Sequence, residues 1–559
     1  MPTRSPAPEF EGGGGWIGVG VPLTLARLRG KAVLVYFWSP SSAECQRLVE
    51  DLRPVEALFA DELVVVGVHS PRFPAEGDLE GAAAAVAALA IGHPVVHDPE
   101  LALWEAYGAR QWPTVVLVGP TGDIAGTVAG EDSGAVLEKA VTEVLERHVA
   151  ADGRVRRRLV RVDRVLPPDG PLAFPGKVAC SPDGRLLAVA DTAHDRVLVC
   201  SLDGVVLEAH TGFLRPQGVR FDLDGVVVCD TLADRLVRTN GEVLADAIVS
   251  PWDVVSDGRS WVVAEAGGHR LLRVRPGELR TRLIAGTGAE GTADGPAEKA
   301  VLAQPSGVTC TPEGVAFVDA GGSALRLVEE DRRGATVSTL VGDRRFECGD
   351  TDGPSDVARL QFPLGVVAHP RIPGGPVYVA DTYNDALRVW EDGRLRTLAV
   401  RGLRRPGGLD LLPDGRLVVA DTGNHRIVVV DPATASVTPV DMDETWVHGT
   451  DGPPVRLAPG QSLALDVAIA LVDEDLDRST AGGGPPVEVV VTSRPSGLLA
   501  SGPLRVRLTA AVGTVEVTGG SPGAGYLLVE VTARTVGVAG PGRRVQRRRH
   551  VLEVDPAPS

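Results

Sequence analysis

The stretch PGGLDLLPDGRLVVADTGNHRI (406–427) decides the fold, because its pattern recurs along the middle of the chain. It opens with a proline and an apolar run, passes through a Pro-Asp-Gly turn and continues as a Val-rich run to an Asp-Thr turn. Short apolar runs separated by turn residues are typical of β-strands that meet in hairpins. The stretch therefore predicts one unit of an antiparallel β structure.

Six such units follow one another. Their openings are PGKVACSPDG (175), PQGVRFDLDG (216), PWDVVSDGRS (251), PSGVTCTPEG (305), PLGVVAHPRI (363) and PGGLDLLPDG (406). The mean period is about 46 residues, which accommodates four short antiparallel strands, as in a propeller blade. We therefore predict a six-bladed β-propeller over residues 154–442.

An acidic residue follows the opening proline of each unit by 14 to 18 residues. These acids are Asp191, Asp230, Glu265, Asp319, Asp381 and Asp421. A carboxylate at the same turn of every unit most simply accepts backbone N–H bonds within its own turn, as Asx-turn residues do. We interpret the six acids as structural. The carboxylates of the fifth-unit insertion, Asp350, Asp352 and Asp356, lack the ordered ligand ladder of a calcium loop, so we interpret them as solvated.

The first 150 residues follow another pattern, in which apolar strands alternate with helices. KAVLVYFWSPSSAEC (31–45) contains a strand, a turn and the start of a helix. The strand ELVVVGVHS (62–70), the helix LEGAAAAVAALAI (79–91) and the strand region QWPTVVLVGPTGDI (111–124) come next. This alternation indicates an α/β domain over 14–150, preceded by a flexible N-terminus at 1–13.

This first domain resembles the thioredoxin-like fold. LRGKAVLVYFW (28–38) is similar to the segment that leads into the redox turn of the cytochrome-maturation and peroxiredoxin-like branch. QWPTVVLVGPTGDI is similar to the segment that holds a cis-proline opposite that turn, which maps to Pro113. The turn of such proteins carries two cysteines separated by two residues. Here the first position is Ser42, and only the second, Cys45, is a thiol.

This replacement bears directly on the chemistry. In a Cys-x-x-Cys pair the first sulfur lies at a helix N-terminus, which lowers its pKa and makes it the attacking thiolate. Ser42 cannot replace it but can N-cap the helix. A two-thiol cycle is therefore excluded. Three interpretations of Cys45 remain open: a single peroxide-reacting or glutathione-capped thiol, a thiol that pairs transiently with a partner's thiol, or a buried helix residue.

The tail from 450 to 557 consists of alternating apolar runs, such as SLALDVAIAL (462–471) and VEVVVTS (487–493), separated by Gly- and Pro-rich turns. This pattern predicts a C-terminal β-sandwich. The basic cluster RRVQRRRH (543–550) has strand spacing, and we interpret it as a solvated strand edge, with an anionic partner as the alternative.

ADTGNHRI (420–427) resembles the signature of the NHL repeat. A thioredoxin-like domain, six NHL blades and a β-rich tail, in that order, resemble the NHL-repeat-containing protein 2 family and its bacterial relatives. The stretches GVHSPRFP (67–74), FPGKV (174–178), SPWDVV (250–255), QPSGV (304–308) and FPLGV (362–366) carry this resemblance. Animal members have a Cys-x-x-Cys turn, from which this sequence departs. The resemblance implies a cytosolic protein whose turn faces a cleft between the first two domains.

Composition and charge argue against several classes of function. The 559 residues carry a net charge of −17, which argues against nucleic acid as a partner, and no apolar run is long enough to span a membrane. No signal peptide opens the sequence, and the six cysteines are scattered without metal-type spacing, which favours a reducing, cytoplasmic setting. We interpret His69, His93 and His97 as structural, and we predict neither a metal nor a cofactor.

Our leading hypothesis is a non-catalytic platform that binds a protein or peptide. Its cleft is predicted near Trp38, Ser42, Cys45, Trp112 and Pro113. The alternative is a one-thiol antioxidant or thiol-disulfide exchange protein that uses Cys45.

Overall fold

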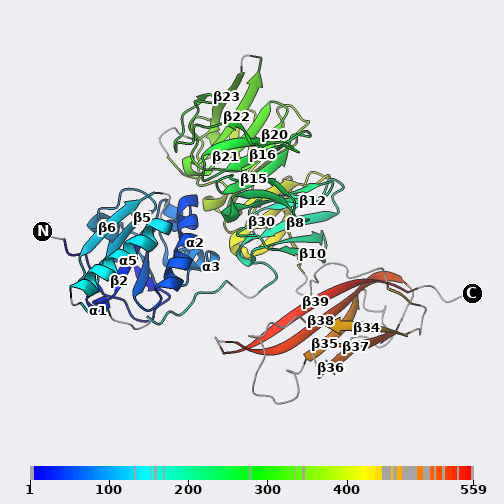
Figure 1. Ribbon diagram of the computed structural model, residues 1–559. Helices are drawn as coiled ribbons and strands as arrows, with labels where there is room; N and C mark the ends of the chain where they lie inside the picture. The colour runs from blue at the N-terminus through cyan, green and yellow to red at the C-terminus, as the bar shows by residue number, and fades with distance from the viewer. Residues whose placement is uncertain are drawn as a thin grey trace, which may run out of the picture. The chain divides into compact units, whose positions relative to one another are not determined.

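The computed structural model describes residues 5–130, 134–151, 153–155, 160–167, 170–275, 277–278, 280–332, 334–342 and 347–442. Beyond residue 442 it describes only the backbone of strands β33 to β39. The chain divides into two compact units. Figure 1 shows its helices and strands in order from the N-terminus to the C-terminus. The first unit comprises Met1–Cys180, Ala190–Asp195 and Phe213–Pro439; the second comprises Ser181–Val189, Arg196–Gly212 and Val440–Ser559.

The N-terminal domain is a six-stranded sheet with helices on its faces, as the thioredoxin-like resemblance implies. The strand order is β1-β4-β3-β2-β5-β6, in which β2 pairs in parallel with β3 and β3 with β4. The strands are β1 (Gly15–Ile17), β2 (Ala32–Trp38), β3 (Leu63–His69), β4 (Val95–His97), β5 (Thr114–Val118) and β6 (Ile124–Ala129). The helices are α1 (Leu25–Leu28), α2 (Ala43–Leu58), η1 (Pro74–Glu76), α3 (Leu79–Ala88), α4 (Ala102–Ala106) and α5 (Gly134–Ala150).

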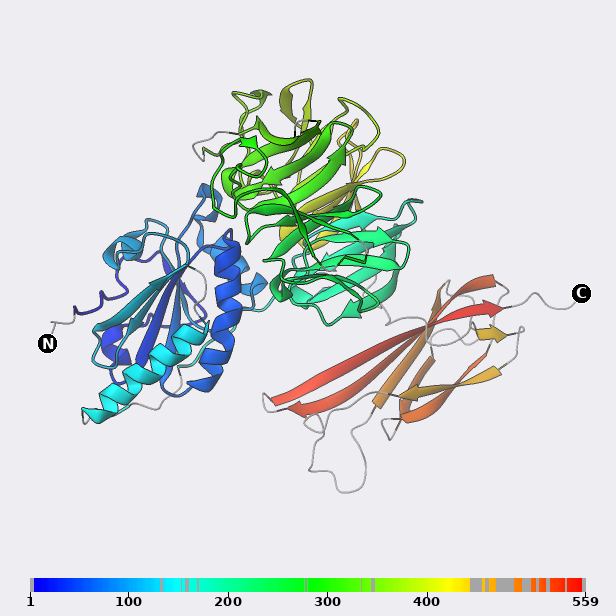
Figure 2. The ribbon, with the colours of Figure 1, turned by 45° about the horizontal axis from the view of Figure 1, so that its top comes forward.

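Strand β2 lies in the interior of this sheet and contributes side chains to a hydrophobic core on each face. Its alternate residues point to opposite sides, because successive side chains of a strand do so. Tyr36 and Trp38 pack with α2, α3 and α5, and Phe37 packs with Trp104 and Tyr107. Helices α2 and α5 lie side by side across the first face (Figure 2). The turn that contains Ser42 therefore follows β2 at a well-packed edge of the domain.

Residues 175–440 form the predicted six-bladed β-propeller, with one antiparallel sheet for each repeat. Blade 1 contains β7 (Val178–Cys180), β8 (Leu186–Asp191), β9 (Arg196–Ser201) and β10 (Val206–Thr211); blade 2 contains β11 (Val219–Asp222), β12 (Gly225–Asp230), β13 (Arg235–Arg238) and β14 (Val243–Ala245). Blade 3 contains β15 (Pro251–Ser256), β16 (Trp261–Glu265), β17 (Arg270–Val274) and β18 (Arg282–Ala285). Blade 6 contains β29 (Gly408–Leu411), β30 (Leu417–Asp421), β31 (Arg426–Val430) and β32 (Val437–Val440).

Blades 4 and 5 each gain a short fifth strand from their insertions. Blade 4 contains β20 (Pro305–Thr311), β21 (Gly314–Asp319), β22 (Ala324–Asp331) and β23 (Gly334–Val341), to which β19 (Gly295–Pro296) is added. Blade 5 contains β25 (Gly365–Ala368), β26 (Val377–Asp381), β27 (Ala386–Glu391) and β28 (Arg394–Thr397), to which β24 (Gly353–Pro354) is added.

The six repeated acids lie at the ends of the second strands, and all are fully buried. One oxygen of each accepts a backbone N–H from the loop before its blade's first strand, 16 to 20 residues earlier. The expectation that this donor lies within the acid's own turn is wrong. Each acid instead links two turns of one blade that are well separated in the sequence.

Threonines after four of the acids connect neighbouring blades. The Thr192 hydroxyl donates to the carbonyl of Pro216, the opening proline of the next blade, at 2.7 Å. The hydroxyls of Thr231 and Thr382 likewise donate to Pro251 and Pro406, the opening prolines of their own next blades. The Thr422 hydroxyl donates to the Pro175 carbonyl at 2.6 Å. The last blade is thereby joined to the start of the first, which closes the ring.

The C-terminal strands form a five-stranded sheet in the order β33-β39-β38-β35-β36 and a two-stranded sheet of β34 and β37. The strands are β33 (Val455–Leu457), β34 (Ser462–Ala468), β35 (Val487–Arg494), β36 (Leu504–Leu508), β37 (Val512–Thr518), β38 (Gly523–Gly537) and β39 (Gly540–Val554). The basic cluster at 543–550 lies within β39, which pairs along its whole length with β38 (Figure 2). Packing of the two sheets as a sandwich stays a prediction.

Candidate functional site

The turn between β2 and α2 occupies the position of a redox turn, and Ser42 caps the helix as predicted. Ser42 has extended backbone angles (φ −96°, ψ 121°), and its Oγ accepts the Cys45 N–H at 3.2 Å. The same hydroxyl donates to Glu44 Oε2 at 2.6 Å. A serine at the N-cap satisfies one of the unpaired amides at the start of a helix. Both hydrogen bonds of the Ser42 hydroxyl therefore stabilise the turn.

Cys45 lies inside the first core of the domain. Its side chain is fully buried and forms no disulfide. Burial raises the pKa of the Cys45 thiol to about 12, because the thiolate would lose its hydration. The thiolate is the reactive form of cysteine, so this thiol is both inaccessible and protonated at neutral pH.

The turn packs directly against the propeller. The Ala43 N–H donates to Gln304 Oε1 at 3.2 Å, and the Ala43 side chain packs against Trp252 and Ala266. In a redox-active fold this edge of the turn has to meet a substrate. Here blades 3 and 4 cover it.

Two further contacts hold α2 against the propeller. The guanidinium of Arg47 donates to both carboxylate oxygens of Asp234, at 2.6 and 2.5 Å, and to Ser250 Oγ at 3.1 Å. Glu44 lies 3.5 Å from His269 Nε2. A two-pronged arginine–carboxylate pair fixes orientation as well as distance, so Arg47 sets how α2 lies on blades 2 and 3.

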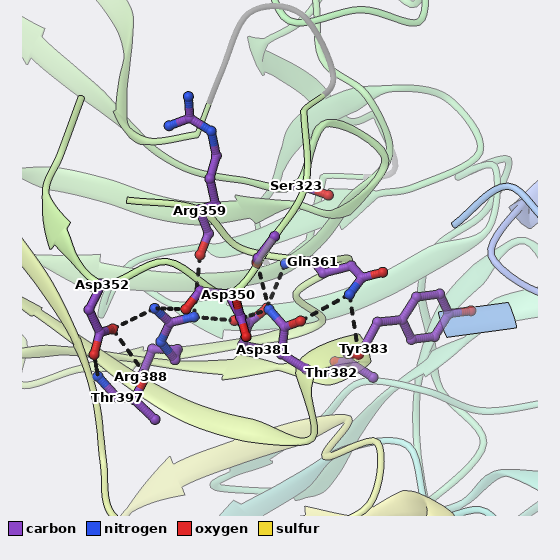
Figure 3. Close-up of polar contacts among 12 residues, drawn as sticks. Ser323, Asp350, Asp352, Arg359, Gln361, Asp381, Thr382, Tyr383, Arg388 and Thr397 are labelled. Carbon is purple, nitrogen blue, oxygen red and sulfur yellow. Dashed lines mark hydrogen bonds and ion pairs between the residues drawn. The ribbon is translucent and has the colours of Figure 1, made fainter. Parts of the chain in front are cut away.

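A third contact comes from the segment after β3. Glu76 accepts the Ser39 hydroxyl at 2.8 Å and the Tyr383 hydroxyl at 2.8 Å, which links the turn to blade 5. Phe73 packs edge-on against Tyr383 and at a tilt against Phe362. Figure 3 shows Tyr383 beside the buried polar contacts of blade 5. The turn and its carboxylate therefore form part of an interdomain seam.

The propeller residues of this seam share one position, immediately before the proline of each repeat. We call them the pre-proline ring: Phe174, Arg215, Ser250, Gln304, Phe362 and Arg405. All have positive φ, between 46° and 69°. The N–H of each donates to a residue four positions after the acid of the preceding blade, and these acceptors are His425, Asp195, Asp234, His269, Ser323 and Asp385 respectively.

Sequence reasoning missed the pre-proline ring, although its signal is present. Each member precedes a repeat proline by one residue, and each acceptor follows a repeat acid by four. The identities vary between repeats, so the positions carry no motif. What they share is the left-handed backbone, and the side chains of Ser250, Gln304 and Arg405 contact the thioredoxin-like domain.

The seam contains a partly open cavity of about 220 Å³. The thioredoxin-like domain contributes Pro40, Gln46, Glu80, Ala84, Ala85, Ala88 and Leu89 to its lining. The propeller contributes two groups, the pre-proline residues Phe174, Arg215, Phe362 and Arg405 and others that include Trp252, Tyr383, Arg404 and His425. The wall is largely apolar and includes the side chains of Arg215, Arg404 and Arg405.

The residues predicted to line a cleft lie elsewhere. Trp38, Ser42 and Cys45 are brought together around the turn but are fully buried, and Pro113 is buried as well. Trp112 is half-buried, donates its indole N–H to the Ser70 carbonyl at 3.0 Å and precedes a cis peptide bond to Pro113. None of these five residues lines the cavity.

Other predicted polar groups are engaged within the protein. His69 Nδ1 lies 2.9 Å from His97 Nδ1, and burial lowers the pKa of His69 to about 3, so His69 is neutral near pH 7. His93 lies between the Tyr36 hydroxyl and Glu56, at 2.8 and 3.0 Å.

Asp352 binds Arg388 and Thr397, while 48% of its side chain stays exposed to solvent. Across the described residues, no group of three or more His, Cys, Asp or Glu side chains is arranged to hold a metal ion. No helix in the part of the chain that the structure describes is long and apolar enough to cross a membrane.

Comparison with known proteins agrees with this architecture. The family described as thioredoxin-like matches residues 30–124, and the NHL repeat matches residues 403–430. NHL repeat-containing protein 2 of Bos taurus is 31% identical over 83% of this chain and 78% of its own length. The chain belongs to the NHL repeat-containing protein 2 family. The family protein of Gallus gallus is 32% identical over 77% of this chain and 71% of its own length. The thiol-disulfide oxidoreductase YkuV of Bacillus subtilis is 31% identical and covers 26% of this chain and 97% of its own length.

Proposed function

We propose that this member of the NHL repeat-containing protein 2 family is a non-catalytic binding platform. Its thioredoxin-like domain lacks redox activity, is docked on the NHL propeller and presents a joint surface to a protein or peptide partner. The observation that carries the proposal is the use of the redox turn in the seam. Ala43 and Glu44 contact blades 3 and 4 at the edge where a redox-active turn would meet its substrate.

The alternative, a one-thiol enzyme, requires Cys45 to ionise and to meet a peroxide or a disulfide. Complete burial and a pKa raised to about 12 oppose both requirements. Ser42 supplies a helix cap and no sulfur. These properties favour the platform over the enzyme.

Thiol accessibility tests the choice. We expect 5,5′-dithiobis(2-nitrobenzoate) near pH 7.5 to modify the half-buried Cys348 of the native protein while Cys45 reacts only at the rate of unfolding. Peptide mass spectrometry after quenching resolves the two sites. Native-state modification of Cys45 faster than Cys348, or sulfenic acid on Cys45 after brief peroxide treatment, would support the enzyme instead.

A pair of arginine variants tests whether docking is what protects the thiol. Arg47→Ala removes the pair with Asp234 and should raise the reactivity of Cys45 severalfold, because the seam opens more often. Arg53→Ala is the matched control, since Arg53 lies on the same helix but, in the described part of the chain, binds only groups of its own domain, the Glu50 carboxylate and the Leu89 and Ala90 carbonyls. Equal reactivity in both variants would mean that the domain core alone shields Cys45.

Partner binding is tested by affinity capture with the intact protein and a Trp112→Ala variant. Of the five predicted cleft residues, Trp112 is the one that keeps exposed surface. We expect the variant to lose captured partners while its circular dichroism spectrum is unchanged. Identical recovery with both proteins would remove this surface from the proposal.

A further inference from the structure

The cavity in the seam is lined by a buried cation, Arg215, whose guanidinium has no paired partner among the described residues. Arg215 is 6% exposed and lines the cavity. Its backbone N–H donates to Asp195 Oδ1 at 2.8 Å, but within the described residues its guanidinium makes no hydrogen bond and no ion pair. Asp195 and Glu50 act on it only at longer range, and Glu50 is held by Arg53 at 2.7 and 3.0 Å.

A buried arginine without a partner is costly, because desolvation of the charge is not repaid by an opposite charge. Burial accordingly lowers the pKa of Arg215 from its usual value. Proteins retain such groups where a ligand supplies the missing charge. The guanidinium presents several N–H donors in a fork that matches a carboxylate. Arg215 is thus poised to receive an anion.

The other charges that face the cavity leave it cationic. Arg404 donates to Glu80 at 2.9 Å, and Arg405 donates to the Ala75 carbonyl at 3.1 Å and stacks over the Tyr383 ring. The imidazole of His425 is kept neutral, since burial and Arg404 lower its pKa. Three guanidinium groups therefore stand against one carboxylate, and that carboxylate already has a partner.

The remaining wall accepts an apolar group. It includes the rings of Phe174, Trp252, Phe362 and Tyr383, and the side chains of Leu89 and three alanines of α3. An engineered apolar cavity of about 150 Å³ is large enough to bind benzene. The seam cavity, at about 220 Å³, has room for a ring and a carboxylate together.

We propose that this cavity binds a small organic carboxylate with one aromatic or branched aliphatic group, with the carboxylate on Arg215 and the apolar group against the aromatic wall. The ligand is a free acid or the C-terminal residue of a peptide, which present the same chemistry. The inference does not depend on the platform function, because it requires only that the seam forms. A bound acid would contact both domains at once and so stabilise their docking.

Calorimetric titration of the full-length protein with two pairs of probes tests the proposal. Phenylacetate and phenylacetamide have nearly the same shape and differ in charge. Acetyl-Gly-Gly-Phe with a free carboxylate and its C-terminal amide do the same for a peptide. We expect phenylacetate to bind at least about tenfold more tightly than phenylacetamide, because the charged pair with arginine is lost in the amide. Tighter binding of the acidic peptide than of phenylacetate identifies a peptide C-terminus as the source.

Two arginine variants sharpen the test. Arg215→Met should weaken phenylacetate binding by at least about tenfold while leaving the thermal midpoint unchanged or higher, because it removes an uncompensated buried charge. Arg416→Met is the control, since Arg416 pairs with Asp414 at the surface of blade 6 and does not line the cavity. A merely structural arginine would lower the midpoint when removed.

Hydrogen exchange of the unmodified protein provides a readout that does not depend on any variant folding. Phenylacetate should slow exchange in the peptides that contain Phe174 and Arg215. The proposal is overturned if neither acid binds saturably, if acid and amide bind equally, if Arg215→Met binds phenylacetate as tightly as the native protein, or if protection falls outside these peptides.

Discussion

Blades 2 to 6 of the propeller are of two kinds, which neutralise the same buried acid in different ways. In the four-stranded blades 2, 3 and 6, the arginine lies five residues after the acid, and 36 to 39% of its side chain is exposed. These arginines are Arg235, Arg270 and Arg426. In the five-stranded blades 4 and 5, the arginine lies seven residues after the acid and is almost completely buried; the two residues are Arg326 and Arg388.

The insertions explain the difference. Asp294 lies beside β19 and binds Arg326 at 2.8 Å. Asp352 lies beside β24 and binds Arg388 at 2.6 Å (Figure 3). A half-exposed arginine leaves its second face to water. A buried one needs a second carboxylate, because an incompletely paired charge in the interior is costly. Each insertion therefore supplies the counter-charge that allows its blade to bury an arginine.

The largest expected effect comes from removing one arginine of each kind. Arg388→Met leaves Asp381 and Asp352 without their cation in blade 5, so we expect a loss of about 3–5 kcal/mol of unfolding free energy. Arg426→Met in blade 6 removes a half-exposed pair and should cost about 1 kcal/mol or less. Hydrogen-exchange mass spectrometry of β26–β27 and β30–β31 peptides measures the local loss in each blade. Equal losses would show that burial of the arginine does not distinguish the two kinds of blade.

A smaller effect is expected from the insertion carboxylates, and it should follow their exposure. Asp294 is 16% exposed and Asp352 is 48% exposed, although each binds an arginine and a threonine in the same geometry. We expect Asp294→Asn to cost about 1–3 kcal/mol and Asp352→Asn about 1 kcal/mol or less. Urea denaturation of the two variants gives the comparison. The reverse order would contradict the role of burial.

The smallest effect concerns pH and the residue four positions after the acid. His425 Nδ1 accepts the Phe174 N–H at 3.1 Å in the four-stranded blade 6, whereas Ser323 Oγ accepts the Phe362 N–H at 3.2 Å in the five-stranded blade 4. Burial, with Arg404, lowers the pKa of His425. Below about pH 6.5 the unfolded state therefore binds more protons than the folded state, and this contribution to stability is lost as the pH falls.

Hydrogen exchange tests this prediction, because the backbone amides of Phe174 and Phe362 form a matched pair. After correction for intrinsic rates, protection of the Phe174 amide should fall as the pH drops below about 6.5. Protection of the Phe362 amide should stay constant, since a serine hydroxyl does not titrate. A parallel decline at both amides would point to a general acid effect and not to His425.

Local patterns predicted much of this fold. The six repeats are visible because each blade is built from short strands and turns whose signals lie within a few residues of one another. Ser42 was recognised as an N-cap for the same reason, since its acceptor geometry depends only on the next three residues. The acids were identified, but their backbone donors were not, because those donors lie 16 to 20 residues earlier.

Most features of the candidate site, by contrast, could not be predicted from the sequence. Trp38, Ser42 and Cys45 were expected at an open cleft, yet propeller residues more than 200 positions away cover the turn. Arg215 was not recognised at all, because an arginine in a loop gives no local sign that it is buried and unpaired among the described residues. The charge pairs of blades 4 and 5 escaped notice because each combines a strand residue with an insertion 32 to 36 residues before it.

The sequence by itself determined the order of domains, the number of blades, the capped turn and the absence of a two-thiol pair, since all of these follow from residue types at short spacings. The tertiary structure alone decided that the turn is covered, that blades 4 and 5 each bury an arginine and that Arg215 faces a cavity between the thioredoxin-like domain and the propeller. Burial and charge pairing depend on which distant segments meet in space, and the cost of desolvating a group is set by that environment and not by its neighbours in the chain.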